Sequence, residues 1–303
     1  MTTTQDHRPE SDSAPLGVGT FPTQMISTTV GGDPESYSSG APSGDLLADR
    51  PRPARLYDYY LNGKDNFAAD RAAADALLKV APTLPTTARE NRRFLERAVR
   101  YLARLGISQF LDIGTGIPTS PNTHEIAQAE DPASRVVYVD NDPMVLAHAR
   151  ALLTSQPEGR TAVLKADLRD PQQILAGARA VLDFQRPIAL MLIAVLHFIE
   201  DSDDPRGLVA ELVEALPHGS CVMLSHVTGD FDPGAWENVV ALYRKAHIPA
   251  QARSRSEIEA ITAGLQIMPP GLQVVSRWRP DGPVDPALTD AAVSCYGVLG
   301  RKS

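Results

Sequence analysis

Apolar side chains recur at two different spacings along the chain, and the spacing changes near Gly106. Before this point, apolar positions return every three or four residues, which is typical of helices with one buried face. Three helices are predicted there, over residues 54–62, 67–80 and 87–105. After it, short apolar runs alternate with helical stretches, which predicts βαβ units and a parallel sheet.

The short apolar runs define the strands that we expect. Five of them alternate with helices: 109–113, 136–140, 162–166, 188–196 and 220–226. The helices between and after them are expected over 122–130, 143–155, 171–180 and 204–216. Because the runs are nearly all apolar rather than alternating, helices should cover both faces of the sheet. Two last runs, 272–278 and 293–299, are separated mainly by turn residues, which predicts an antiparallel hairpin.

The first 49 residues differ from the rest in composition. They are rich in Ser, Thr, Pro, Gly and Asp, and their few large apolar residues show no period. Such a segment cannot bury enough surface to offset the entropy lost on ordering. We therefore expect a disordered tail over residues 1–49, a helical extension over 50–106 and one α/β domain over 107–303.

Charge and cysteine content exclude several classes of function. The net charge of −8 makes general binding to nucleic acid unfavourable, so no nucleic-acid partner is expected. Two cysteines, Cys221 and Cys295, provide neither a metal cluster nor a disulfide framework. The chain shows no secretory signal and no apolar run near the roughly 20 residues that span a membrane. We expect a cytoplasmic protein without a metal.

Candidate ligand-binding residues follow the first predicted strand. In an open α/β sheet, ligands bind beyond the carboxyl ends of the strands. The first strand ends in Asp112, and Gly114 and Gly116 then allow a tight turn with close approach of backbone to ligand. The next helix has Asn122 at its N-cap position and Glu125 three residues later. This helix start is expected to favour an anionic group, such as the carboxylate of a methionine moiety.

Acidic residues also end the second and third strands. Asp140 can accept hydrogen bonds from two ribose hydroxyls, unless it or Asp142 only caps the following helix. Asp167 can accept from an adenine amino group, and the N–H of Leu168 can reach a ring nitrogen. The alternative is again a helix cap, for which Asp170 is the better candidate.

The three strand-end acids together favour one cofactor. A pyrophosphate would be repelled by this much negative charge, whereas an adenosine that carries a sulfonium and an ammonium would not. A dinucleotide fingerprint would also require glycine where Thr119 stands. The pattern predicts S-adenosylmethionine rather than NAD.

The stretch from about Arg55 to Ser303 resembles a bacterial family of S-adenosylmethionine-dependent methyltransferases long catalogued as a domain of unknown function. The matching segments are RLYDYYLNGKDNFAADR, FLDIGTGIPT, VVYVDNDPMVLAHARALL, ADLRDP, AVLHFI and GSCVMLSH. The resemblance implies a class I, Rossmann-like α/β fold with sheet order 3-2-1-4-5-7-6 and an antiparallel last strand. It also implies cofactor contacts at Asp112, Gly114, Gly116, Asp140, Asp167 and Leu168, to which we add the neighbouring Thr115 and Asn141.

Two histidines are candidates for a general base. His197 and His226 end the fourth and fifth strands, which are neighbours in the implied sheet. An imidazole titrates near neutral pH and is suited to removing a proton from a methyl acceptor. The alternative is that each histidine caps a strand or packs beneath a loop.

The aromatic segment at the start of the extension is the last candidate part of the site. Tyr60, Asn62 and Lys64 are expected to line a cover over the cofactor and to exclude water. The alternative is that the tyrosines of this segment are core residues that dock the helices.

Three functions remain in contention. The first is a methyltransferase that acts on a small-molecule acceptor, on O, N or C. The second is a protein that binds S-adenosylmethionine without catalysis, as a sensor or partner. The third is an NAD-dependent oxidoreductase, which the strand-end acids, Thr119 and the terminal hairpin disfavour. The sequence does not indicate the oligomeric state.

Overall fold

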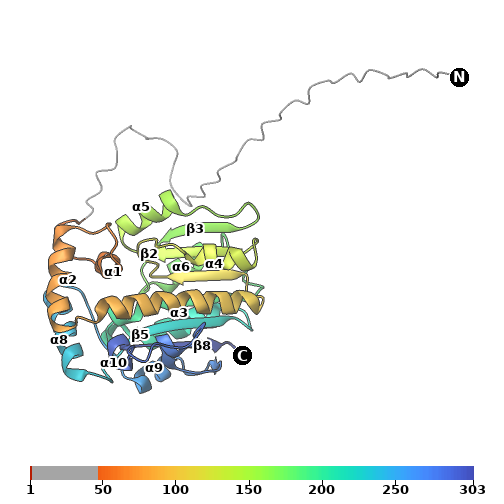
Figure 1. Ribbon diagram of the computed structural model, residues 1–303. Helices are drawn as coiled ribbons and strands as arrows, with labels where there is room; N and C mark the ends of the chain where they lie inside the picture. Colours follow the sequence, from red (N-terminus) through yellow and green to blue (C-terminus); the bar gives the residue numbers. More distant parts are fainter. Residues whose placement is uncertain (2–46) are drawn as a thin grey trace. The chain divides into compact units, whose positions relative to one another are not determined.

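The computed structural model describes Met1 and residues 47–303, so the predicted tail lies almost entirely outside the described residues. The strands are β1 Gln109–Ile113, β2 Arg135–Asp140, β3 Arg160–Lys165, β4 Ala189–Ile193, β5 Cys221–Val227, β6 Gln266–Ile267, β7 Gln273–Val274 and β8 Cys295–Arg301. They form one sheet in the order β3-β2-β1-β4-β5-β8-β6, and β7 also pairs with β8. The strands β1 to β5 are parallel, and β8 is antiparallel to β5 (Figure 1). With β6 and β7 taken as two pieces of one edge strand, this is the predicted class I order.

Helices occupy the intervals that the apolar periodicity indicated, together with intervals for which no helix was predicted. The helices are α1 Pro53–Tyr60, α2 Ala68–Val80, α3 Leu84–Arg104, α4 Thr123–Glu130, α5 Pro143–Leu152, α6 Pro171–Ala178, α7 Pro205–Ala215, α8 Pro233–Lys245, α9 Arg255–Ile261 and α10 Asp290–Val293. Three short 3-10 turns are η1 Leu196–Phe198, η2 Asp201–Asp203 and η3 Val275–Arg277. The helices α8, α9 and α10 are additions to the sequence-based expectation.

Four helices begin with the same pair of residues, Asp followed by Pro. The side chain of the aspartate at the N-cap accepts a backbone N–H of the first turn, as Asp142 and Asp232 do in α5 and α8. Proline at the next position has no N–H to leave unpaired and a φ angle already suited to a helix. The same pairs start α6 and α7, at Asp170 and Asp204. This local chemistry fixes where each helix leaves the loop at the carboxyl ends of the strands.

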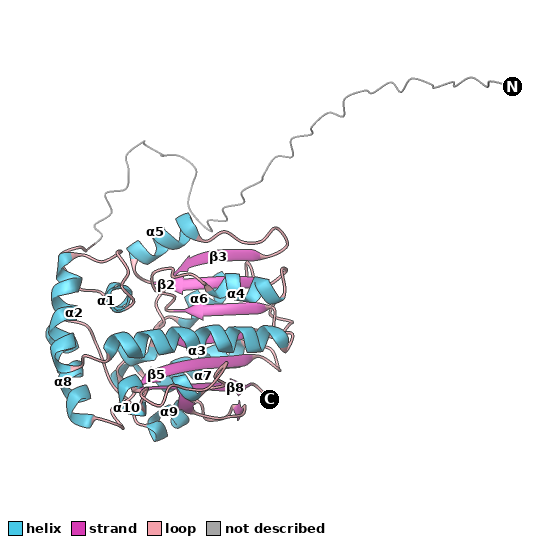
Figure 2. Cartoon of the chain, in the orientation of Figure 1, coloured by secondary structure: helices cyan, strands magenta, loops and turns pink. Residues whose placement is uncertain are grey.

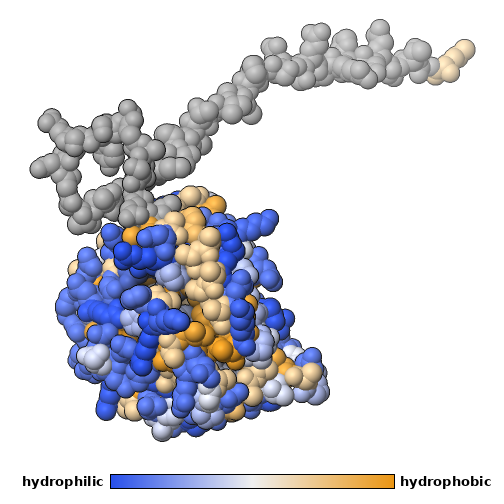
Figure 3. All heavy atoms as spheres, turned by 90° about the vertical axis from the view of Figure 1, so that its left-hand side faces the viewer, coloured by the Kyte–Doolittle hydropathy of each residue, from blue (hydrophilic) through white to orange (hydrophobic). Residues whose placement is uncertain are grey.

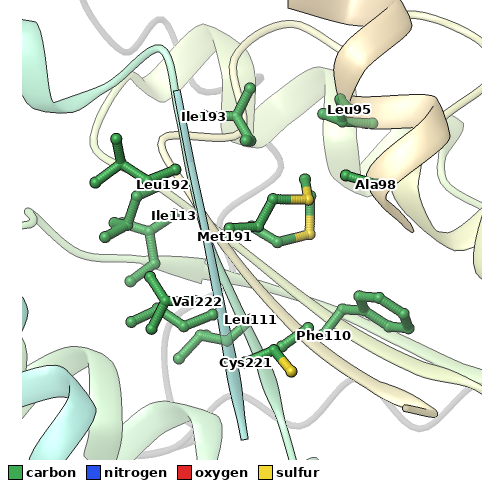
Figure 4. Close-up of a cluster of buried hydrophobic side chains, with 14 of the residues drawn as sticks. Leu95, Ala98, Phe110, Leu111, Ile113, Met191, Leu192, Ile193, Cys221 and Val222 are labelled. Carbon is green, nitrogen blue, oxygen red and sulfur yellow. The ribbon is translucent and has the colours of Figure 1, made fainter. Parts of the chain in front are cut away.

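The sheet is covered on both faces, as its continuous apolar runs predicted. The helices α3 and α4 lie in front of it and α6 and α7 behind it (Figure 2). Along β4, Met191 and Ile193 point toward Leu95 of α3, whereas Leu192 points to the opposite face (Figure 4). All five residues of β4 are buried, so this central strand lies in the main core.

The predicted strand over residues 272–278 is wrong beyond Val274, where the chain turns into η3. The guanidinium of Arg97 on α3 donates to the carbonyl oxygens of Val275 and Trp278, at 2.6 and 3.0 Å. The ring of Trp278 is fully buried, with Phe94 in an edge contact at 5.3 Å between ring centroids. These contacts with α3 replace further pairing along β8. The residues of this segment were apolar because they pack on a helix, not because they continue a strand.

The N-terminal helices form a second apolar cluster at the end of the sheet where the cofactor loops were expected. Its members include Leu56 and Tyr60 of α1, Leu77 of α2, and Trp236 and Val239 of α8. Figure 1 shows α1, α2 and α8 together at that end, and Figure 3 shows apolar surface between hydrophilic side chains on this face. Within the described residues, no helix is long and apolar enough to cross a membrane.

Candidate functional site

A cavity of about 370 Å³ opens at the carboxyl ends of the strands, a size within the range of small-molecule sites. Its walls come from the loops after β1 to β4, from α1 and α3, and from α8 with the segment that follows it. Ten of the thirteen predicted site residues line it: Asp112, Gly114, Thr115, Gly116, Asp140, Asn141, Asp167, Leu168, Tyr60 and His197. The other three, Asn62, Lys64 and His226, are not among its lining residues.

The glycines of the loop after β1 serve different purposes. Gly114 has a φ angle of +74°, and a β-carbon on it would come within 2.5 Å of Cγ2 of Val195. Gly116 has a φ angle of +68°, but a β-carbon there would meet nothing within 4 Å. The first glycine therefore lets two loops pack together. The second leaves open space beside the cavity, where a ligand can approach the backbone.

Asp112 is a buried carboxylate at the base of this loop. Its Oδ2 accepts from the hydroxyl of Thr123 at 2.8 Å, and no other described residue bonds its second oxygen. Burial raises its pKa to about 6, and the hydrogen bond from Thr123 opposes part of that rise. At neutral pH the group is therefore mostly an incompletely solvated anion, and a cationic ligand would stabilise it.

The start of α4 does not have the role that the sequence suggested. One half of the predicted capping box is present, since the carboxylate of Glu125 accepts the backbone N–H of Asn122. The carboxylate of Glu125 also accepts from the hydroxyl of Ser120 at 3.1 Å. This helix terminus already holds an anion from its own first turn, and neither Asn122 nor Glu125 lines the cavity. The prediction that it receives the carboxylate of a ligand is therefore not supported.

The sequence left open whether Asp140 or Asp142 caps the helix that follows β2, and the structure assigns the cap to Asp142. Asp142 caps α5, because its Oδ1 accepts from the N–H of Met144 at 2.8 Å. Asp140 accepts at 2.9 Å from the N–H of Gly116 and, through its other oxygen, at 2.9 Å from the N–H of Asp142. Its carboxylate thus links the first two strand-end loops and still lines the cavity. Burial raises its pKa from the ordinary value.

Asp167 is likewise separate from the helix cap that follows it. The cap of α6 is Asp170, whose side chain accepts from the N–H of Gln173 at 3.0 Å. Asp167 accepts from Asn141 Nδ2 at 2.7 Å and from the N–H of Arg169 at 2.9 Å. These bonds hold Asn141 and Asp167, from two neighbouring loops, against each other at the cavity wall.

The helix α1 forms another wall of the cavity and is tied to the sheet by buried charge. The guanidinium of Arg55 is fully buried and lies 3.2 Å from Asp142 Oδ1, and the partly exposed Arg52 lies 3.3 Å from Oδ2. Tyr57 and Tyr60 of the same helix line the cavity. These two arginine contacts were not predicted, because nothing local in the sequence indicates a partner about 90 positions away.

We expect Arg55→Met to lower the free energy of unfolding by about 3 kcal/mol, because it leaves the buried carboxylate of Asp142 without its buried partner. The matched variant is Arg52→Met, which removes a charge from the same carboxylate but from a position that is 32% exposed. It should cost less than about 1 kcal/mol. Urea unfolding of both variants measures the difference, and equal losses would contradict the assignment.

Asn62 and Lys64 lie in the turn after α1, and both side chains are exposed. The turn is organised instead by Asp58, which accepts from the amide of Asn66 at 2.8 Å and from the N–H of Asp65 at 2.9 Å. The prediction that Asn62 and Lys64 line the site is therefore corrected. The polar residues of this segment shape a turn, whereas Tyr57 and Tyr60 reach the cavity.

His197 lies in η1, directly after β4, and lines the cavity. Its Nδ1 is buried and has no hydrogen-bond partner among the described residues. Its ring packs against Phe198, with 4.2 Å between centroids. Burial holds the pKa of His197 well below its usual value, and the nearby His226 and Arg253 lower it further. The imidazole is therefore neutral at physiological pH, and no hydrogen bond within the described residues engages its ring.

His226 is corrected as a candidate base, because both of its ring nitrogens are engaged away from the cavity. Nδ1 bonds the carbonyl oxygen of Val227 at 2.7 Å, and Nε2 bonds the guanidinium of Arg253 at 2.9 Å. Arg253 also donates to the carbonyl oxygens of Leu196 and Ile199, at 3.0 and 2.8 Å. His226 thus helps to hold the loop that carries His197.

The burial of His226 has a measurable effect on stability. Burial lowers its pKa to about 3, so between pH 3 and 6.5 the unfolded chain binds a proton that the folded chain does not. Stability should therefore fall as pH drops below 6.5, by about 1.4 kcal/mol per pH unit from this group. In urea unfolding between pH 6.5 and 5.0, His226→Gln should lose about 2 kcal/mol less than the unaltered protein. Parallel pH profiles would show the assignment to be wrong.

The wall opposite the strand-end loops was missed in the sequence. It comes from α8 and from residues 246–252, for which no element was predicted. A signal was present, since Trp236, Val239, Val240 and Tyr243 recur at helical spacing after the Asp232-Pro233 start. Among the described residues, no group of three or more His, Cys, Asp or Glu side chains could hold a metal ion.

Comparison with known proteins identifies the family of the chain. A family model described as S-adenosyl methyltransferase matches residues 39–303. The chain is 45% identical to a DUF574 family protein from Streptomyces avermitilis, with a TM-score of 0.83, covering 85% of this chain and 100% of that one. It is 43% identical to a putative methyltransferase from Thermobifida fusca, with a TM-score of 0.80, covering 86% of this chain and 98% of that one. None of the curated proteins matches. The chain belongs to the S-adenosyl methyltransferase family, whose cofactor is S-adenosylmethionine.

Proposed function

We propose that this protein transfers the methyl group of S-adenosylmethionine to a small-molecule acceptor that binds in the same cavity. The observation that carries the proposal is the composition of the cavity wall. The strand-end loops supply three carboxylates, and the lining also includes apolar and aromatic side chains from α1, α3 and α8. A cofactor with a sulfonium and an ammonium suits the carboxylates, and a second, less polar molecule suits the apolar and aromatic side chains.

The cofactor-binding residues are assigned by their hydrogen-bonding capacity. Asp140 would accept from the ribose hydroxyls, and Asp167 with the N–H of Leu168 would bind the adenine edge. Asp112 has a carboxylate oxygen to which no other described residue donates, and this oxygen would accept from the ammonium group. When bound, the cofactor supplies an electrophilic methyl group on a positively charged sulfur.

His197 is the proposed general base. Its buried Nδ1 can take the proton of an acceptor hydroxyl or amine while the acceptor's lone pair forms the bond to the methyl carbon. The bond between the methyl carbon and sulfur would break with its electrons left on sulfur. The positive charge that sulfur loses is then matched by the proton that His197 gains. A base is required only for an acceptor that arrives protonated, and positioning and exclusion of water supply much of the remaining acceleration.

Calorimetric titration with S-adenosylmethionine, S-adenosylhomocysteine and NAD tests the proposal. Binding of the two adenosyl ligands at micromolar strength, with none of NAD, is the expected result. The catalytic part is then tested by transfer of radiolabelled methyl to candidate acceptors. Failure of both adenosyl ligands to bind would rule out the proposed function, and binding without any transfer would favour the non-catalytic alternative. The cytoplasmic location remains a prediction.

A further inference from the structure

Part of the cavity lining is built from aromatic rings that lie close to one another. The hydroxyls of Tyr60 and Tyr243 are 3.4 Å apart, and the ring of Tyr243 lies 5.9 Å from that of Phe198. Phe198 in turn packs on His197. Together with Trp236 and Tyr57, these residues line the cavity, and we call this part the aromatic compartment. Its rings favour a flat, apolar ligand that packs face or edge against them.

The charged side chains that line the cavity are concentrated at the cofactor loops. Asp112, Asp140 and Asp167 belong to those loops. The lining arginines are bound to them: Arg52 to Asp142, Arg92 to the carbonyl oxygens of Thr119 and Pro121, and Arg169 to Asp167. The lining residues of α8 and of the segment 246–252 include no Asp, Glu, Lys or Arg, and the histidine among them, His247, is exposed. A carboxylate, phosphate or ammonium packed against α8 and this segment would therefore lose its hydration without gaining a charged partner there.

The cavity lining contributed by α3 contains one buried polar atom whose hydrogen-bonding capacity is unused and can be identified as that of an acceptor. The amide nitrogen of Asn91 donates to the hydroxyl of Tyr57 at 2.9 Å, and that hydroxyl donates its single proton to the carbonyl oxygen of Ala88 at 3.0 Å. This chain fixes the orientation of the amide. Asn91 Oδ1 is left as a buried acceptor with no partner among the described residues, on a side chain that is 2% exposed and lines the cavity. Buried acceptors of this kind are normally satisfied.

We propose that the methyl acceptor is an uncharged aromatic molecule that binds between the rings of the aromatic compartment and donates a hydroxyl or N–H group to Asn91 Oδ1. This inference rests on the proposed function, because it takes the strand-end loops as the cofactor site. Shape and ring contacts select a flat molecule, the absence of a charged partner selects a neutral one, and Asn91 selects one with a donor group.

The test compares four probes of one size on protein saturated with S-adenosylhomocysteine: 1-naphthol, naphthalene, 1-naphthoate and protonated 1-naphthylmethylamine. The dissociation constants are measured by fluorescence. We expect 1-naphthol to bind, naphthalene to bind about tenfold more weakly, and both ions to bind more weakly still. Undetectable binding of 1-naphthol, or binding of either ion as tight as that of 1-naphthol, would overturn the inference. These comparisons use the unaltered protein and need no variant to fold.

The variant Asn91→Leu tests whether bound 1-naphthol donates its hydrogen bond to Asn91 Oδ1. It should weaken 1-naphthol about tenfold and leave the affinities for naphthalene and S-adenosylhomocysteine unchanged. Asn238→Leu makes the same substitution on an exposed position of α8 outside the cavity and should change none of them. Equal weakening of 1-naphthol and naphthalene would refute the bond to Asn91, and loss of S-adenosylhomocysteine affinity would assign Asn91 to the cofactor instead. If the unaltered protein does not bind S-adenosylhomocysteine, the proposed function itself fails.

Discussion

Replacing Asp140 with alanine is expected to weaken the binding of S-adenosylhomocysteine by a factor of about 10² to 10⁴. Two hydrogen bonds from ribose hydroxyls to a carboxylate contribute roughly 1.5–3 kcal/mol each. The same side chain accepts the N–H groups of Gly116 and Asp142, so its loss also loosens two loops of the cofactor site. Calorimetry on the purified variant measures the effect.

The matched control for this variant is Asp170→Ala. Asp170 also ends a strand-to-helix loop and accepts a backbone N–H, but it does not line the cavity. Its replacement should cost about 1 kcal/mol of stability through the lost helix cap and leave the affinity for S-adenosylhomocysteine unchanged. If both variants bound the ligand as the unaltered protein does, Asp140 would be a structural residue of the loops and no more.

Replacing His197 with glutamine is expected to lower kcat by a factor of about 10² to 10⁴ for an acceptor that loses a proton. Because burial holds the pKa of His197 well below its usual value, the imidazole stays unprotonated as pH rises from 6.5 to 8.5. The rate of the unaltered protein should therefore show no inflection from this group in that range. The measurement is transfer of radiolabelled methyl to an acceptor that supports turnover.

Two results would argue against His197 as the base. One is a His197→Gln variant with unchanged kcat, and the other is a loss of kcat that accompanies an equal loss of S-adenosylhomocysteine affinity. The second pattern would mean that the imidazole supports the cofactor site rather than the acceptor. Comparison of kcat with cofactor affinity in one variant separates these roles.

The sheet could be predicted from the sequence because each parallel strand contains a short apolar run. The strands β1 and β4 could be recognised without knowing which strands pair with them, since a strand covered on both faces consists largely of apolar residues. The edge of the sheet was harder, because Trp278 is equally apolar and packs on α3 instead. A buried side chain does not by itself indicate which element covers it.

The residues of the candidate site likewise divide into those that the sequence could indicate and those that it could not. Asp112, Asp140 and Asp167 could be found because topology alone brings strand ends together. The difference between His197 and His226 could not, because it depends on Arg253, which meets His226 from 27 positions later in the chain. The unsatisfied acceptor of Asn91 depends in the same way on Tyr57, 34 positions earlier. Pairings of this kind are properties of the folded chain.

The bond between Arg55 and Asp142 bears on how the protein can be divided. The described residues from 47 onward belong to one compact unit, although α1 lies outside the stretch that carries the strands. A fragment from residue 107 onward would keep every strand but leave Asp142 without both arginines and uncover the apolar side of α8 that packs against Leu56 and Tyr60. The smallest autonomous form of this enzyme therefore begins before α1, and α1 is an integral wall of the domain rather than an appendage.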